Sequence, residues 1–356
     1  MTILIVSSLT DSCTANYFIE AFEELNREIF VISDKPSKNT NFLAKSLVDV
    51  KLIIRKFKLS VDFLFFIEGG SMRILPDVFG EFSFPTAWYA IDSHMDIDKH
   101  KSLAKIFDYT FVAQKEYIKF FTEENVLWLP LAFPSKRIVK NFRDKTIDIS
   151  SVGSLNRNVH PTRYLIKENL EKKFSNTKII ETNPDEMFEI YQSSFIVLNK
   201  SINNDINMRY FEGLGSGAIL LTNRIFDNGI EDIFDENAHI FYYDNESEIN
   251  EMCELILNDE NLIKKCMQNK TNIHKNHTYI NRCEMLLDVI CKDTSHKPVN
   301  AIDMLNSCLK LNIISGSIKF LKILLGNINY GRKSKILVSI LGITMTFISQ
   351  ICRVFE

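Results

Sequence analysis

The feature that most constrains the fold is a regular alternation of short apolar segments with stretches of helical periodicity. In the first part of the chain the apolar segments are Ile3–Ser7, Ile29–Ser33, Val61–Glu68, Thr86–Asp92, Tyr109–Ala113 and Val126–Pro130. Between the first two, either Thr14 or Asn16 is placed to cap a helix. Phe18, Phe22 and Leu25 fall on one stripe of that helix. Alternation of this kind predicts a parallel α/β sheet covered by helices.

The alternation stops at Leu131–Thr146, where Pro134 and several lysines and arginines interrupt it. It restarts afterwards, with apolar segments at Ile147–Val152, Thr177–Ile180, Phe195–Asn199, Ala218–Thr222 and Ile240–Tyr243. We therefore predict two doubly wound, Rossmann-like domains, residues 1–134 and 147–291, joined by a linker at 135–146. Ligands of open α/β sheets bind at the carboxyl ends of the strands, so the functional loops are expected in a cleft shared by the two domains.

Charge is distributed unevenly along the chain. Residues 292–356 carry 9 Lys and Arg against 3 Asp and Glu, and the remaining residues carry 33 against 42. Because the residues before 292 carry a net negative charge, the sequence argues against binding to duplex nucleic acid, which needs a basic face. The seven cysteines form no CxxC pair or zinc-type spacing and predict reduced thiols. The start, MTILIVSS, predicts a buried strand rather than a signal peptide, so we expect a cytoplasmic protein.

The segment with the most chemical information is NNDINMRYFEGLGSGAILLTN, residues 203–223. Asn207 stands where a helix begins, and Arg209 and Glu212 lie one turn apart on that helix. Gly215–Gly217 end the helix before a buried strand.

A resemblance to a known family rests on the runs INMRYFEGLGSGAILLTN, GIEDIFDENAHIFYYDNESEI and HTYINRCEMLLDVI. They resemble the glycosyltransferase domain of the CgeB-like spore-maturation family, which is related to the group 1 (family 4) glycosyltransferases of GT-B fold. Upstream, the family's N-terminal half is similar to AWYAIDSH, FVAQKEYIKFF and NVLWLPLAF. The resemblance covers roughly residues 60–290, and its most specific motif is Asn-x-Arg-x-Phe-Glu.

The resemblance implies a GT-B enzyme that holds a nucleotide-sugar donor against its C-terminal domain. Glu212 would then accept hydrogen bonds from the two ribose hydroxyls, a task for which an ionised carboxylate has the acceptor capacity. The alternative is that Glu212 only pairs with Arg209 on a solvated helix face. Arg209 is also a candidate to neutralise a donor phosphate.

The donor diphosphate needs positive charge and free backbone N–H groups, which a glycine loop between a strand and a helix provides. The segment SSVGSLNRNVHPTRYL is such a loop, with a helix expected from Pro161 or Thr162. The resemblance places Gly153 and Arg157 at the phosphates, and Lys200, just after a strand, is a further candidate. An ordinary surface turn and a solvated lysine are the alternatives.

One position departs from the family 4 pattern. There a second glutamate, eight residues before the ribose-binding one, contacts the donor sugar, and this chain has Asn204 instead. The donor sugar is therefore left open, as is the choice between retention and inversion of the anomeric configuration. Inversion needs a base from the N-terminal domain, whereas retention needs none if the donor phosphate takes the acceptor proton.

The segment AIDSHMDIDKH, residues 90–100, is rich in candidates for that base. In one interpretation Asp92 is the catalytic base and His94 the second choice, because both follow a strand. In another, Asp96 and Asp98 hold a divalent cation, as in GT-A enzymes, although two Rossmann-like domains are the wrong architecture for that. In the third, Asp96 or Asp98 caps the next helix and the histidines are exposed.

Two further runs are assigned smaller roles. FIEGG, residues 66–70, ends a strand with Glu68 and two glycines. Such a turn exposes its backbone and would let an acceptor approach; the alternative is that Glu68 only caps the next element. His277, Thr278 and Arg282 match the family's HTYxxR pattern, and we predict Thr278 as a helix cap and Arg282 as structural.

The tail, residues 292–356, lies outside the resemblance. Within 310–356, a window without charge follows several basic residues, which predicts helices at an anionic membrane surface. Packing on the body, formation of a homodimer or a membrane span are the alternatives.

Together these observations predict a cytoplasmic GT-B glycosyltransferase, peripheral to the membrane in one interpretation. It would move a sugar from a nucleotide-diphosphate sugar to a hydroxyl of a glycan, a lipid-linked glycan or a protein. By analogy with the family the sugar is a hexose. No metal or other cofactor is expected, and no nucleic-acid partner. A GT-B epimerase, a phosphorylase and a non-catalytic assembly protein remain as alternatives.

Overall fold

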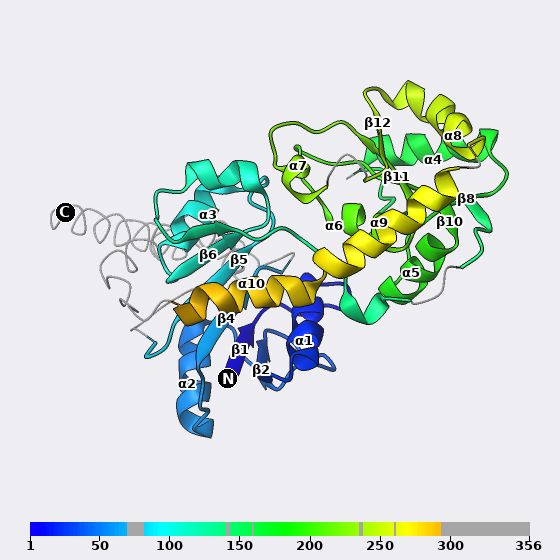
Figure 1. Cartoon of the computed structure of the whole chain (residues 1–356). Coiled ribbons are helices and arrows are strands. Elements are labelled where there is room, and N and C mark those ends of the chain that lie inside the picture. The colour runs from blue at the N-terminus through cyan, green and yellow to red at the C-terminus, as the bar shows by residue number, and fades with distance from the viewer. Residues whose placement is uncertain (70–81, 140–142, 159, 235–237, 260, 293–356) are drawn as a thin grey trace, which may run out of the picture.

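The computed structural model describes residues 1–69, 82–139, 143–158, 160–234, 238–259 and 261–292. These residues form two α/β domains that lie side by side, each built on one parallel sheet (Figure 1). The two-domain α/β architecture predicted from the alternation is therefore present. The tail predicted to contact a membrane, 310–356, lies outside the described residues.

The first sheet has seven parallel strands in the order β3-β2-β1-β4-β5-β6-β7. Its strands are β1 (Thr2–Val6), β2 (Glu28–Ser33), β3 (Phe42–Leu43), β4 (Phe63–Ile67), β5 (Thr86–Ala90), β6 (Tyr109–Val112) and β7 (Val126–Trp128). The helical segments of this part are α1 (Thr14–Glu24), α2 (Leu47–Phe57), α3 (Ile97–Ala104) and the 3-10 turn η1 (Lys115–Phe120). Strand β1, buried throughout, pairs with β2 and β4 and forms the centre of the domain.

The second sheet has five parallel strands in the order β12-β11-β10-β8-β9. Its strands are β8 (Ile147–Val152), β9 (Thr177–Ile180), β10 (Ser194–Leu198), β11 (Ile219–Asn223) and β12 (Ile240–Tyr243). The helices are α4 (Pro161–Lys173), α5 (Pro184–Gln192), α6 (Met208–Gly215), α7 (Ile230–Ile233), α8 (Ile249–Leu257) and α9 (Leu262–Asn276), with short turns η2 (Ser135–Arg137) and η3 (Glu246–Glu248).

Every apolar segment predicted as a strand contains one, because continuous apolar runs suit strands buried on both faces. The sequence analysis missed β3, whose two residues pair with Ile32 and Ser33 at the edge of the first sheet. It also misplaced the start of α1. The N-cap is Cys13, and Thr14 is already the first helical residue.

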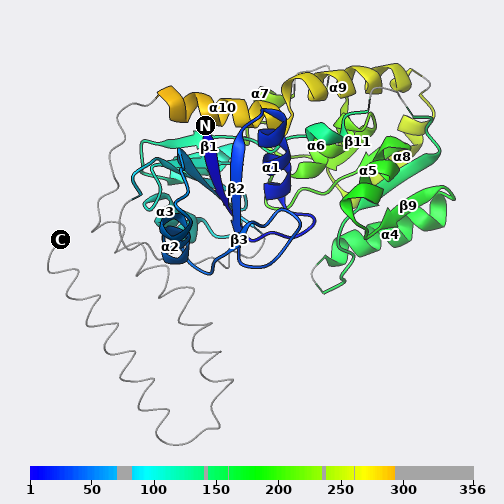
Figure 2. The same cartoon turned by 90° about the horizontal axis from the view of Figure 1, so that it is seen from below.

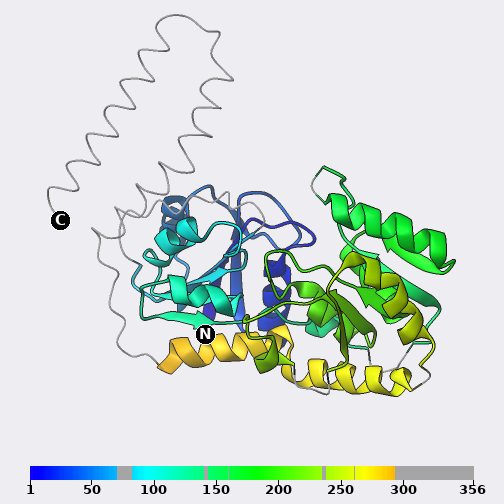
Figure 3. The same cartoon turned by 90° about the horizontal axis from the view of Figure 1, so that it is seen from above.

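The last described helix, α10 (Tyr279–Lys292), returns to the first domain, although the predicted boundary assigns these residues to the second. Figures 2 and 3 show α9 lying along the second domain and α10 along the first. The chain segments that connect the two domains are in direct contact. Phe133, just after the first sheet, pairs with Thr278 in an isolated parallel bridge. A single chain segment therefore spans both domains.

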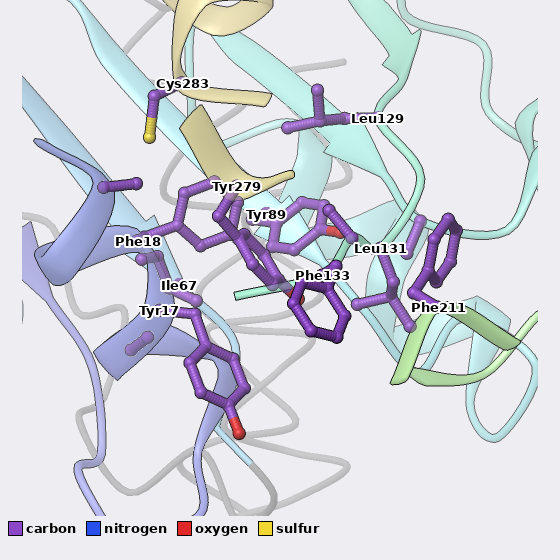
Figure 4. Close-up of a cluster of buried hydrophobic side chains, with 14 of the residues drawn as sticks. Tyr17, Phe18, Ile67, Tyr89, Leu129, Leu131, Phe133, Phe211, Tyr279 and Cys283 are labelled. Carbon is purple, nitrogen blue, oxygen red and sulfur yellow. The ribbon is translucent and has the colours of Figure 1, made fainter. Parts of the chain in front are cut away.

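Aromatic side chains fill the space between α1, the first sheet and α10 (Figure 4). The ring of Tyr279 lies edge-on to Phe18 with centroids 4.9 Å apart, and Phe18 lies edge-on to Tyr89 at 5.2 Å. Phe133 packs so tightly against α6 that a Cβ at Gly215 would lie 2.3 Å from its ring. This packing links the two domains through one continuous core.

Arg282 on α10 is structural, as predicted, and is only 3% exposed. Its guanidinium donates to the carbonyls of Pro130 (2.8 Å) and Leu131 (3.3 Å), in the chain segment that leaves the first sheet. These carbonyls follow β7 and are shielded from water, so they depend on Arg282 for partners.

Replacing Arg282 by Met should lower the free energy of unfolding by about 2–4 kcal/mol, because two buried carbonyls lose their donor. Urea unfolding followed by circular dichroism measures this change. Lys292→Met, at the exposed end of the same helix, is the control and should change stability by less than about 0.5 kcal/mol. Equal midpoints for the two variants would contradict the structural role.

Candidate functional site

The carboxyl ends of the two sheets meet where the domains join. Hydrogen bonds between the loops that follow the strands show the contact. Gln114, after β6, accepts the N–H of Ile206 at 2.9 Å, and Asn204 donates to the carboxylate of Glu116 at 3.0 Å. The candidate site lies along this junction, where the sequence analysis placed the functional loops.

Glu212 lies on α6 and is 8% exposed. Burial raises the pKa of its carboxyl to about 7, and the charge of Arg209 offsets part of that rise. The charge of the carboxylate raises the pKa of Tyr17 and of Tyr279, so Glu212 lies near the first domain. Among the described residues, no side chain or N–H hydrogen-bonds to it. The carboxylate is not among the fully buried, unpaired groups of the described residues, so it keeps contact with water and can accept hydrogen bonds from a ligand.

Arg209 does not pair directly with Glu212, as the solvated-face alternative required. Its guanidinium donates to the hydroxyl of Tyr191 (3.1 Å), the side-chain oxygen of Asn199 (2.8 Å) and the carbonyl of Val152 (2.6 Å). Three fixed partners hold the positive charge at the carboxyl ends of β8 and β10. An anion at these strand ends would meet a preorganised cation.

Gly153 follows β8 and adopts a φ of +153°, which favours glycine. A Cβ at this position would lie 3.0 Å from the guanidinium of Arg209 and 3.1 Å from that of Arg163. Two like charges therefore flank one bare stretch of backbone. Burial and the charge of Arg209 lower the pKa of Arg163, which is the electrostatic consequence of this approach.

A small, partly open hollow with a volume of about 10 Å³ lies beside Arg163. It is lined by Ser151, Arg163, Ile166, Ile179, Leu198, Asn199 and Lys200. A space of this size holds about one water molecule, and its wall carries the charges of Arg163 and Lys200.

The remaining predicted donor residues have partners of their own. Asn207 caps α6 by accepting the N–H of Arg209 at 3.1 Å. Lys200 forms an ion pair with Glu246. The side chain of Arg157 is 62% exposed, lies over the ring of Tyr164 and pairs with Glu168, so it follows the surface of α4.

In the first domain, the loop after β5 carries Asp92 and His94. Asp92 is half-buried and feels the charge of Asp205 from the second domain, so its carboxyl lies near the junction. Burial and the charge of Glu68 raise the pKa of Asp92. His94 is in the same loop, and its backbone carbonyl accepts a hydrogen bond of 3.5 Å from Asn203 of the second domain.

The two aspartates proposed as an alternative metal pair have other contacts. Asp96 caps α3 by accepting the N–H of Lys99 at 3.2 Å, and Asp98 pairs with Lys101 at 2.8 Å. His100 is buried, contrary to the interpretation that exposes it. In the described part of the chain, no group of three or more His, Cys, Asp or Glu side chains has the arrangement of a metal site.

Asn204, which stands where family 4 enzymes carry a second glutamate, joins two domains. Its amide group donates to Glu116 and to the carbonyl of Phe226, and its oxygen accepts the N–H of Phe226 at 2.8 Å. With both ends of the amide in use, Asn204 contributes to the junction rather than offering a free carboxylate to a sugar.

Among the described residues, no helix is long and apolar enough to cross a membrane.

Comparisons with known proteins bear on the family and the fold. Residues 136–288 match a family model described as glycosyl transferase-like. No curated protein sequence matches the chain.

Solved structures match over both domains. Anabaena HepE in complex with UDP-glucose superimposes with a TM-score of 0.60 at 8% identity, covering 82% of this chain and 100% of that one. A glycosyltransferase from Rickettsia africae gives 0.57 at 13% identity, covering 83% and 99%. An α-glucosyltransferase in complex with UDP and DNA gives 0.54 at 15% identity, covering 82% and 99%. The chain has the GT-B fold.

The sequence analysis missed Arg163. Arg163 lies in the segment that carries the glycine loop. Three basic or aromatic residues nearby were equally plausible phosphate ligands, so the sequence did not single it out. Its place on the first turn of α4 offered a signal, since that turn faces the carboxyl end of β8. Tyr191 was missed as well, because a tyrosine at the end of a helix gives no sign that its hydroxyl will hold Arg209.

Glu212→Gln should stabilise the protein at pH 8 and leave stability unchanged below pH 4.5. The folded-state pKa of about 7 lies above the ordinary 4.5, so ionising the folded carboxyl costs free energy that grows from pH 4.5 to about 7. The cost removed at pH 8 is on the order of 2–3 kcal/mol.

Denaturant unfolding of both proteins at pH 4.5, 6 and 8 measures this difference. Glu189→Gln, at an exposed position on α5, is the control and should show no such trend. A stability difference that is the same at all three pH values would mean that the Glu212 carboxyl titrates normally.

Proposed function

We propose that the protein is a glycosyltransferase that moves a sugar from a nucleotide-diphosphate sugar to a hydroxyl acceptor. The observation that carries the proposal is Glu212, a buried carboxylate at the domain junction with no hydrogen-bond donor among the described residues. The match to a glycosyl transferase-like family and the GT-B fold support it. Solved relatives of that fold hold UDP or UDP-glucose, so a uridine donor is the first to test.

In this proposal Glu212 accepts hydrogen bonds from the ribose hydroxyls of the donor. Ribose hydroxyls would satisfy its acceptors without adding charge, and Arg209 nearby favours the ionised form.

The donor diphosphate would bind at the backbone of Gly153, between Arg163 and Arg209. Both guanidinium groups approach this backbone, and an anion there would relieve their mutual repulsion. The same charges would stabilise the nucleoside diphosphate as it leaves, a role that requires no resident metal. Lys200 and Arg157 would contribute less, because a glutamate already neutralises part of the charge of each.

Asp92 is the proposed base on the acceptor side. It lies in the first domain, near the junction, with its pKa raised towards the range in which a base works at neutral pH. His94 remains the second choice, because its loop meets the second domain. The Asn-x-Arg-x-Phe-Glu run supports, as part of this proposal, a relationship to the CgeB-like group.

UDP should raise the melting temperature of the wild-type protein by several degrees, and Glu212→Gln should abolish most of that rise. The reason is that glutamine loses the charge-assisted acceptors for the ribose hydroxyls. Differential scanning fluorimetry with UDP, GDP and ADP measures the effect, with Glu189→Gln as the matched control.

The outcomes separate the functions considered. Indifference of the wild-type protein to every nucleotide would favour a non-catalytic assembly role. Release of UDP from UDP-glucose indicates transfer or hydrolysis, whereas exchange of the sugar with inorganic phosphate indicates a phosphorylase, and conversion to another UDP-sugar indicates an epimerase.

Binding of UDP-glucose should tighten about tenfold between pH 6 and pH 8, because only the ionised form of Glu212, with a pKa of about 7, accepts two hydrogen bonds. Isothermal titration calorimetry at both pH values measures this change. Glu212→Gln should bind weakly and without that dependence on pH. An affinity that is constant from pH 6 to pH 8 would argue against a role for this carboxylate.

A further inference from the structure

A buried chain of polar side chains lies beneath the loop that carries Asp92. Glu68 follows β4, and His100 lies on α3 with 2% of its surface exposed. The carboxylate of Glu68 is 3.0 Å from Nε2 of His100, and Nδ1 of the same ring is 3.0 Å from the hydroxyl of Ser93. Ser93 is itself fully buried, so the hydrogen-bonded side chains of His100 and Ser93 are not exposed to a substrate.

Glu68 binds the backbone of the loop directly. One of its oxygens accepts the N–H of Ile91 at 2.6 Å and the N–H of Asp92 at 3.0 Å. Burial would raise the pKa of Glu68, but the hydrogen bond and charge of His100 and the two N–H groups lower it overall. An ionised carboxylate with three fixed partners therefore sets the path of the chain at Asp92.

Unlike the carboxylate of Glu68, the side chain of Asp92 has no fixed hydrogen-bond donors among the described residues. Several charges face it. Glu68 and, from the second domain, Asp205 disfavour its ionised form, as burial does, whereas His94 and His100 favour it. The buried pair thus holds the backbone of Asp92 firmly while its carboxylate faces the junction.

We propose that Glu68 and His100 are positioning residues that hold Asp92 as the base of an inverting sugar transfer. Asp92 takes the proton of the acceptor hydroxyl, whose oxygen forms a bond to the anomeric carbon of the donor. The bond from that carbon to the diphosphate breaks, and its electron pair leaves with the nucleoside diphosphate. The inference rests on the proposed function and adds the stereochemical outcome and two residues that do not touch the substrate.

A purely structural pair would hold the ends of β4 and β5 together, and its loss would lower stability without a specific loss of kcat. Glu68→Gln tests whether Glu68 acts on Asp92. Glutamine keeps an oxygen that accepts the N–H groups of the loop but removes the charge that disfavours ionisation of Asp92. The pKa of Asp92 should then fall if Glu68 acts on it.

The first experiment measures the pKa of Asp92 directly, by ¹³C NMR titration of its carboxyl in full-length protein, assigned with Asp92→Asn. We expect the titration midpoint to move to lower pH in Glu68→Gln, with the backbone amide of Asp92 exchanging faster with solvent. An unchanged midpoint together with an unchanged exchange rate would overturn the inference.

The second experiment uses His100→Gln and follows the consumption of UDP-glucose. Misplacing the base should lower kcat about tenfold or more and leave KM for UDP-glucose within about twofold, because the donor binds to the other domain. His277→Gln is the control, since it removes a partly buried imidazole that contacts Arg282 and lies outside the site. A loss of kcat no greater than that of the control would overturn the inference.

The two experiments separate this inference from the proposed function. A wild-type protein that binds none of UDP, GDP and ADP contradicts the function, and the titration of Asp92 still tests the influence of Glu68. A protein that binds UDP and turns over normally in both variants retains the function and contradicts the positioning role.

Discussion

The arrangement of the two sheets depends on how α10 is anchored to the first domain. Arg282 donates to two carbonyls of the segment that leaves the first sheet, and Tyr279 packs among the aromatic rings between α1 and that sheet. Each sheet alone would present its carboxyl edge to water. Because α10 returns across the junction, the two edges face each other, and their loops form one site.

Carboxylates at this junction fall into two kinds. Glu68 has donors from His100 and from two N–H groups, and its buried charge is stabilised. Glu212 and Asp92 have no such donors among the described residues, and burial raises the pKa of each. Such groups cost folding free energy, which a protein tolerates where a ligand or a reaction later uses them.

The arginines also fall into two kinds, those that support the fold and those that are placed to bind a ligand. Arg282 is committed to backbone carbonyls and supports the fold. Arg209 also has three partners, but they fix it beside the bare backbone of Gly153, where Arg163 approaches from α4. Two cations held close together without a carboxylate between them form a site for an anion rather than a structural ion pair.

Much of the fold was predictable from the sequence, because strands buried on both faces are continuous apolar runs that can be recognised locally. The edge strand β3 was not, since its two residues are extended only through pairing with β2. Glu212, Arg209, Gly153 and Asp92 could be named as candidates because each follows a strand or lies in a recognisable motif. Arg163 and Tyr191 were missed, because their roles come from contacts with residues distant in the sequence.

The amino-acid sequence by itself determined two α/β domains, the ends of their strands and a short set of candidate residues, since these depend on periodicity and on local backbone preference. Only the tertiary structure decided which candidates have partners and which do not. Arg157 follows the surface with Glu168, whereas Glu212 is buried without a donor among the described residues. The reason is physical: desolvation and the approach of like charges are set by chain segments that meet only in the folded protein.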